Sequence, residues 1–242
     1  MPTGRAVLTW SPDTKLITAM IDAYGFTPGS SHAMHIHPGT CANQTQPPSV
    51  PFGDISADHG GAIRQSVVST TPAPNGITTG SYLNIHLAPS AQLGSPNDVS
   101  FTPIACADIP AGAGPGGPVT LMLRAPSSSG QTAQGSTTLS YNPTAHTLKV
   151  EVSASGLPPN SAHAVHIHSG TCRAQGDVLY PLPDLQTNGT GQGSVTTTLN
   201  NVPDGPPDTG WYVNLHMGSM SQILSDGKPT LLFAPLLCAD VT

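Results

Sequence analysis

Hydrophobic and polar residues alternate along much of the chain, which is the pattern of β-strands with one buried face. Clear examples are Leu83–Leu87 and Leu148–Val152. Turn-forming sequences such as Asp58–Gly61 and Pro74–Gly76 lie between the candidate strands. The pattern predicts an all-β fold of the antiparallel sandwich or barrel type.

The composition supports this fold class and excludes several kinds of partner. Charged residues make up 8% of the chain, against about 25% in an average soluble protein, and long surface helices need many more. Gly and Pro contribute 26 residues each, as expected for many turns. A net charge of -6 with seven Lys or Arg gives no field that attracts a polyanion, so we expect no nucleic-acid partner. No apolar run approaches the roughly 20 residues of a membrane span.

Three sequence blocks recur at a nearly constant offset. Residues 31–41 return as 162–172, residues 82–86 as 212–216 and residues 106–109 as 238–241, at offsets of 131, 130 and 132. A constant offset over three blocks indicates two copies of one domain. We therefore expect a first domain at 1–109, a Gly/Pro linker at 110–118 and a second domain at 119–242.

The two copies differ at their starts. Gly135 matches Gly4, but residues 119–125, which precede Gly135 and alternate like a strand, have no counterpart before Gly4. We therefore expect domain 1 to lack its first strand. That edge is either unprotected, or filled by another segment or another chain, which would permit self-assembly.

Eight of the ten histidines fall into four repeat-matched pairs. The pairs are His32/His163, His35/His166, His37/His168 and His86/His216. Residues two apart in a strand share a face, so His35 and His37 point the same way. A third imidazole from another strand completes a three-nitrogen site with an open position. The predicted metal ligands are His35, His37 and His86 in the first domain, and His166, His168 and His216 in the second.

These motifs resemble two related families. His-Ile-His followed by Gly-Thr-Cys, a later strand with one His, and a terminal Cys-Ala-Asp resemble the copper/zinc superoxide dismutase fold. The strands that carry Tyr-Val-Asn-Leu-His and His-Ile-His also resemble the chordin-type (CHRD) domain. The resemblance implies two tandem Greek-key β-domains, one copper per domain on the histidines named above, and intradomain disulfides. These disulfides pair Cys41 with Cys106 and Cys172 with Cys238.

Two departures from the superoxide dismutase pattern affect the expected chemistry. The zinc-loop histidines should lie between the His-x-His strand and the late histidine. No histidine occurs from 169 to 215, and the corresponding part of the first domain has only His59, which we interpret as a turn residue rather than a ligand. Zinc is therefore not expected. The positions of the family's substrate-guiding arginine are Pro103 and Pro235 here. The loss of this cation counts against superoxide dismutation.

Other residues near the predicted sites have open roles. His32 and His163 are each a fourth ligand, a partner of a ligand, or a loop histidine. Asp54 and Asp184 either orient a ligand imidazole or form a turn.

Three functions compete at this point. The first is an exported copper-binding protein for buffering, storage or delivery, with a copper-delivery partner. The second is a copper-only superoxide dismutase, and we leave open whether the protein is an enzyme. The third is a structural cell-surface or filament module with strand exchange. Four cysteines and few charges indicate an extracytoplasmic protein, secreted, periplasmic or at the cell surface, whose leader has been removed before Met1.

Overall fold

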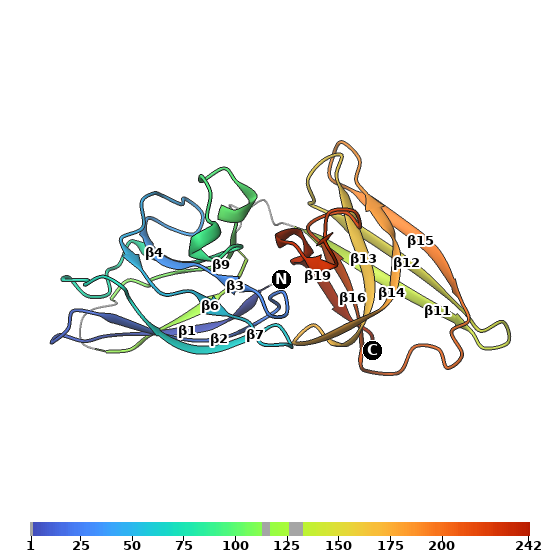
Figure 1. Ribbon diagram of the computed structural model, residues 1–242, viewed down its shortest axis with the longest axis horizontal. Coiled ribbons are helices and arrows are strands. Elements are labelled where there is room, and N and C mark those ends of the chain that lie inside the picture. The colour runs from blue at the N-terminus through green and yellow to red at the C-terminus, as the bar shows by residue number, and fades with distance from the viewer. Residues whose placement is uncertain (1, 113–116, 126–132) are drawn as a thin grey trace. The chain divides into compact units, whose positions relative to one another are not determined.

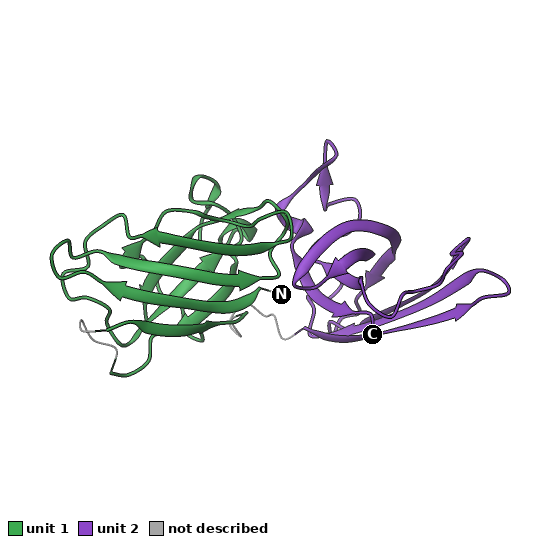
Figure 2. Cartoon of the chain, turned by 90° about the horizontal axis from the view of Figure 1, so that it is seen from below, with its two compact units in different colours: residues 1–129 green, residues 130–242 purple. Residues whose placement is uncertain are grey.

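The chain folds into two compact β-units. The computed structural model describes residues 2–112, 117–125 and 133–242. The first unit comprises residues 1–129 and the second residues 130–242 (Figures 1 and 2). Residues 113–116 of the predicted linker lie outside the described residues. Strands dominate both units and the described helices are short 3-10 turns, so the predicted all-β class is confirmed. Within the described residues, no helix is long and apolar enough to cross a bilayer.

The first unit contains two four-stranded antiparallel sheets. One has the strand order β10-β1-β2-β7, the other the order β5-β4-β8-β9, and β3 and β6 form a small additional pair. Buried aliphatic side chains from both sheets form its core, for example Leu8, Ile21, Leu83 and Ile85. The elements are β1 (Thr3–Trp10), β2 (Ile17–Tyr24), β3 (Ser31–His32), β4 (Met34–Pro38), β5 (Val50–Pro51), β6 (Ile55–Ser56), β7 (Ala62–Val68), β8 (Ser81–His86), η1 (Ser90–Gln92), η2 (Val99–Phe101), β9 (Pro103–Asp108) and β10 (Val119–Leu123).

The second unit repeats this arrangement with one strand fewer. Its sheets have the orders β11-β12-β15 and β14-β13-β16-β19, and β17 pairs with β18. Strand β12 alternates between buried and exposed residues. Its buried apolar side chains pack against those of β13 and β16 in one hydrophobic core. The elements are β11 (Gln134–Asn142), β12 (Thr147–Ser155), β13 (Ala162–Thr171), β14 (Ala174–Gln186), β15 (Gly193–Asn200), β16 (Trp211–His216), β17 (Leu224–Ser225), β18 (Lys228–Pro229), η4 (Leu231–Phe233) and β19 (Pro235–Asp240).

The placement of β10 corrects the expected division of the chain. The sequence assigns residues 119–125 to the second domain, but Val119–Leu123 pairs with β1, with Leu123 opposite Gly4 and Val119 opposite Leu8. The β1 edge of the first unit is therefore filled by another segment of the same chain. Self-assembly through that edge, as the sequence suggested, has no open strand edge to use. Sequence order misled here because β10 is equally close in the chain to both units.

Strand register positions the same residue types at the same places in both units. In the first unit, His35 lies opposite Asn84 and His37 opposite Tyr82. In the second, His166 lies opposite Asn214 and His168 opposite Tyr212. The two-strand register therefore brings the His-x-His pair beside the strand that ends in the third histidine.

Candidate metal centres

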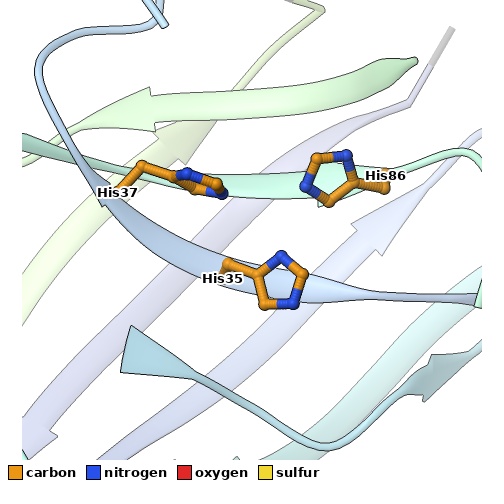
Figure 3. A group of neighbouring side chains, drawn as sticks. All are labelled: His35, His37 and His86. Atoms are coloured by element: carbon orange, nitrogen blue, oxygen red, sulfur yellow. The ribbon is translucent and has the colours of Figure 1, made fainter. Parts of the chain in front are cut away.

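Three buried histidines come together in the first unit. His35 and His37 extend from β4 and His86 from the end of β8, and the three rings face a common space (Figure 3). One ring nitrogen from each residue lies within 4.8 Å of those of the other two. The side chains are 9%, 0% and 0% exposed, respectively. Strand alternation predicted that His35 and His37 share a face, and in the structure that face is covered rather than open to solvent.

The second unit holds the equivalent group. His166 and His168 lie on β13 and His216 ends β16, and their nearest ring nitrogens again lie within 4.8 Å of one another. The ring centroids of His166 and His216 are 4.8 Å apart, against 5.2 Å for His35 and His86. The structure thus brings together all six histidines predicted as ligands, three in each unit.

Backbone carbonyls orient two rings in each group. The Nδ1 atom of His37 lies 2.9 Å from the carbonyl oxygen of Thr45, and that of His86 lies 2.9 Å from the oxygen of Phe101. Because a carbonyl oxygen only accepts, Nδ1 must carry the proton and donate it. The Nε2 atom of each ring is then unprotonated and directs its lone pair away from the carbonyl. This is how metal-binding histidines are commonly held.

The second unit uses the same device. His168 donates from Nδ1 to the carbonyl oxygen of Gly176 over 3.1 Å, and His216 donates to that of Phe233 over 2.5 Å. The accepting residues Phe101 and Phe233 were missed by the sequence argument. They occupy matched positions before Pro103 and Pro235, so the repeat itself was the signal that could have revealed them.

Several nitrogens in these groups are buried without a hydrogen-bond partner among the described residues. They are Nδ1 of His35 and Nε2 of His37 in the first unit, and Nε2 of His168 in the second. Leaving a buried polar atom unpaired is unfavourable, and such atoms are rare without a ligand or water to satisfy them. In the second unit, Nδ1 of His166 lies 3.0 Å from Nε2 of His216. A bound cation would satisfy the two unpaired nitrogens of the first unit and that of His168 in the second.

Burial keeps these imidazoles in the neutral form that binds metals. Desolvation by burial, with smaller contributions from the neighbouring His86 and His37, lowers the pKa of His35 to about 4. Burial likewise lowers the pKa of His37 and of His166 to about 4, and that of His216 to about 3. The pKa values of His86 and His168 are also lowered, mainly by burial. At neutral pH, all six rings therefore offer a lone pair rather than a charge.

A tyrosine forms one wall of each group. The ring of Tyr82 stacks on His37 at 5.3 Å between centroids and 14° between planes, and Tyr212 stacks on His168 at 4.8 Å and 18°. Both tyrosines are fully buried. Tyr82 and Tyr212 were not predicted as site residues, although strand alternation places each on the same face as the third histidine.

His32 and His163 lie outside the two groups. The Nδ1 atom of His32 is 3.0 Å from the carbonyl oxygen of His86 and its Nε2 is 2.6 Å from Oγ of Ser30. His163 repeats these contacts with the carbonyl of His216 at 2.9 Å and Oγ of Ser161 at 2.7 Å. Both ring nitrogens are thus used in hydrogen bonds. Of the three roles left open, these contacts favour a partner that supports the backbone of the third ligand.

The carboxylates and the remaining candidate histidine also lie apart from the groups. Asp54 accepts hydrogen bonds from the backbone and hydroxyl of Ser90, and Asp184 accepts one from the backbone of Met220. Ser90 and Met220 each follow the third histidine by four residues, so these aspartates fasten the loop that leaves it. His59 is exposed beside Asp58, which accepts hydrogen bonds from the backbone of the turn.

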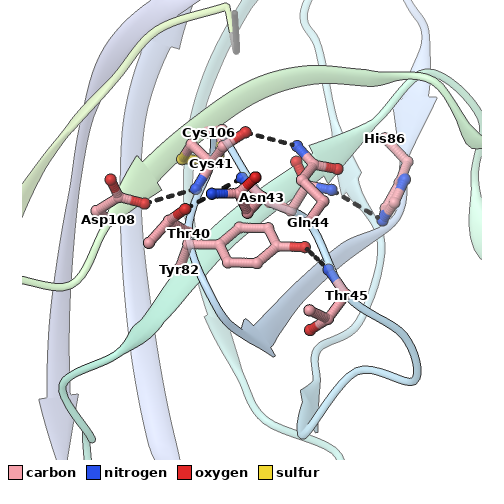
Figure 4. Close-up of a disulfide and its surroundings, with 10 residues drawn as sticks. Thr40, Cys41, Asn43, Gln44, Thr45, Tyr82, His86, Cys106 and Asp108 are labelled. Atoms are coloured by element: carbon pink, nitrogen blue, oxygen red, sulfur yellow. Dashed lines mark hydrogen bonds between the residues drawn. A yellow bond between two sulfur atoms is a disulfide. The ribbon is translucent and has the colours of Figure 1, made fainter. Parts of the chain in front are cut away.

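A disulfide fastens the loop after each His-x-His strand. Cys41 is bonded to Cys106 and Cys172 to Cys238, which is the pairing that the family resemblance implied. Figure 4 shows the first of these bridges beside Tyr82, whose hydroxyl accepts a hydrogen bond from the backbone of Thr45. Since the carbonyl of Thr45 receives the proton of His37, the bridged loop helps to define the orientation of that ligand.

Part of the chain matches a known family. Residues 118–220 match the model of the CHRD domain. The matched region begins just before β10 and contains His166, His168 and His216. No curated protein matches the chain. The fold and the two sites therefore define an all-β protein with a CHRD match in its second half and two three-histidine groups that can hold metal ions.

Proposed function

We propose that the protein is an exported copper-binding protein with one mononuclear three-histidine site in each unit, used for copper buffering, storage or delivery. The proposal rests on three buried, neutral imidazoles that lie close together in each unit and include nitrogens with no hydrogen-bond partner among the described residues. His35, His37 and His86 hold one ion, and His166, His168 and His216 hold the other. A copper-delivery protein is the expected partner.

The chemistry of the donors favours copper over zinc. Copper(II) binds nitrogen ligands more tightly than zinc does in the Irving-Williams order, and copper(I) also accepts imidazole. Among the described residues, neither His59 nor a carboxylate joins the histidine groups. The two disulfides fit a protein that folds in an oxidising compartment, as an exported one does.

The burial of the sites favours storage over rapid turnover. A copper-only superoxide dismutase, the alternative proposal, needs an open coordination position that an anion reaches quickly. The most exposed of the six histidines is His35, at 9%, and those of the second unit are at most 3% exposed. The net charge of -6 gives no general attraction for superoxide. A structural role for the chain is compatible with these sites but does not explain them.

Two measurements test the proposal. The metal-free protein is equilibrated with equimolar copper(II) and zinc(II), desalted and subjected to elemental analysis, and we expect copper to predominate at both sites. Equal or greater zinc would contradict the assignment to copper. Superoxide decay is then followed with micromolar copper-loaded protein. A rate close to that of the metal-free protein supports storage or delivery, whereas rapid decay would favour the dismutase.

A further inference from the structure

The second unit has an open groove where the first unit has a strand. In the first unit, β10 pairs with β1, and Arg124, which follows β10, forms a β-bridge with Cys106 of β9. The second unit has β11 in place of β1 and β19 in place of β9, and among the described residues no strand lies beyond β11. A groove occupies this place, with Gly135, Thr137, Val213, Leu215, Leu237 and Ala239 among its lining residues.

Register shows that the two positions are equivalent. Gly4 lies opposite Ala23, and Gly135 lies opposite Ala154, at the same point of the corresponding strand pair. On the other side, Cys106 lies opposite Asn84, and Cys238 opposite Asn214. The groove between β11 and β19 is therefore bordered like the place that β10 fills in the first unit.

Burial differs between the units in the way that a missing strand predicts. Ala105, Cys106 and Ala107 of β9 are 0%, 3% and 7% exposed. Their counterparts in β19 are less covered, since Leu237 and Cys238 are partly exposed and Ala239 is exposed. The same contrast holds on the other border, where Ala6 is fully buried and Thr137 is partly exposed.

Backbone hydrogen-bonding groups also point into the groove. In the first unit, the amide of Cys106 donates to the carbonyl of Arg124 over 2.7 Å, and the amide of Arg124 donates back over 3.1 Å. Cys238 lies opposite Asn214 as Cys106 lies opposite Asn84, so we expect the amide and carbonyl of Cys238 to point in the same direction as those of Cys106, into the groove. No described residue bonds to them as Arg124 does to Cys106. The groove thus offers both apolar side chains and unpaired backbone groups, as a strand acceptor does.

We propose that the groove between β11 and β19 accepts a strand from another polypeptide. The occupant has the chemistry of β10, an extended segment with aliphatic residues at every second position. In β10 these residues are Val119, Leu121 and Leu123, which are 8%, 2% and 0% exposed, while Met122 between them is 60% exposed. The added strand pairs antiparallel to β11, with its last aliphatic residue opposite Gly135. This proposal does not depend on the metal sites.

Among the described residues, the chain has one strand of this kind, β10, but two edges that could accept it, those of β1 and β11. The CHRD match begins at residue 118, so the family pattern counts β10 with the second unit. The structure nevertheless pairs β10 with the first unit. Exchange of β10 between copies would fill one groove and empty another, with no net gain in pairing. A strand from a different polypeptide therefore fits the vacant position better than a second copy does.

The full-length protein and a synthetic peptide test the proposal. The probe is a labelled peptide with the sequence of residues 118–125, and its control carries aspartate in place of the leucines at 121 and 123. Fluorescence anisotropy measures affinity, and hydrogen exchange locates the site. We expect one peptide per chain, no binding of the control, and new protection of the amides of Cys238 and the outer edge of β11.

A charged side chain in the groove provides the matched variant. Ala239 is exposed, so Ala239→Arg leaves the fold intact while it places a charge in the path of the added strand. We expect it to weaken peptide binding at least tenfold. Thr196→Arg, at an exposed site on the opposite edge strand β15, is the control and is expected to bind normally. Binding that survives Ala239→Arg, no binding to the unaltered protein, or a dimer formed by exchanged β10 would each overturn the proposal.

Discussion

The imidazole of His163 donates a hydrogen bond from Nδ1 to the backbone carbonyl oxygen of His216 over 2.9 Å. A buried, fully bonded histidine thus supports the backbone of a predicted ligand that lies 53 residues away in the chain. His32 supports His86 in the same way. The repeated contact distinguishes the histidines that support the backbone from the three in each unit that form the candidate metal site.

Replacing His163 should weaken the site without removing it. His163→Ala leaves a buried carbonyl unpaired and creates a cavity. We therefore expect the free energy of unfolding to fall by about 2–4 kcal/mol. The affinity of the second site for copper should fall by about tenfold or more, as for other residues that position a ligand, while the number of coppers bound stays at two. Urea unfolding and copper titration measure these effects. His59→Ala, at an exposed turn, is the control, and loss of one copper in His163→Ala would instead make His163 a ligand.

The stability of the metal-free protein should fall on mild acidification. Unfolded histidines titrate near pH 6.5, whereas burial lowers the pKa of His35, His37 and His166 to about 4 when folded. Between these values, the unfolded chain binds protons that the folded chain does not. The stabilisation is therefore complete above pH 6.5 and is lost as the pH falls towards 4.

Urea unfolding at pH 7.0, 6.0, 5.0 and 4.5 measures this dependence without metal. Between pH 7.0 and 5.0 the change in stability reports mainly on histidines, because carboxylates titrate mainly at lower pH. His216→Gln removes one of the buried rings and should reduce the slope of stability against pH. A midpoint that is constant from pH 7.0 to 4.5 would show that the histidines are not held neutral by burial.

Each disulfide should stabilise its own unit. The bridges Cys41–Cys106 and Cys172–Cys238 span 65 and 66 residues, and removing bridges of this size costs about 2–5 kcal/mol. A variant with both Cys172 and Cys238 replaced by serine should lose stability in the second unit and leave the first unchanged. Two-step urea unfolding, with hydrogen exchange to assign each step, measures this. Equal loss in both units would indicate that they fold as one cooperative body.

The assignment of β10 to the first unit can be tested at one buried residue. Leu121 is 2% exposed and lies opposite Ala6. Leu121→Ala should destabilise the first unit by about 2–5 kcal/mol through the cavity that it creates. Met122→Ala is the control, since Met122 is 60% exposed. If hydrogen exchange instead shows weakened protection in β11 and β12, then β10 pairs with the second unit in solution.

Sequence alone could predict the two histidine groups because their geometry follows from local rules. His35 and His37 share a face by strand alternation, and the repeat linked them to His86 through a matching set in the other half. Their neighbours on loops were harder to find. Whether the carbonyl of Thr45 or Phe101 faces a ring depends on how a long loop folds back, which no periodicity encodes.

The placement of β10 was beyond the sequence for a different reason. Residues 119–123 alternate like a strand and come before the repeat-matched Gly135, whereas no counterpart comes before Gly4, so the repeat favours pairing with β11. The strand pairs with β1 instead. Leu123 lies opposite Gly4, and β11 carries Gly135 at the matched position, so alternation cannot choose between the two strands as the partner of β10.

Metal stoichiometry tests the central claim most directly. The protein and the variants His37→Gln, His168→Gln and the double variant are loaded with copper(II), desalted and subjected to elemental analysis. We predict two coppers per chain for the unaltered protein, one for each single variant and none for the double variant. Circular dichroism and the retained disulfides establish that each variant is folded. No retained copper in the unaltered protein, or two coppers in the double variant, would contradict two independent three-histidine sites.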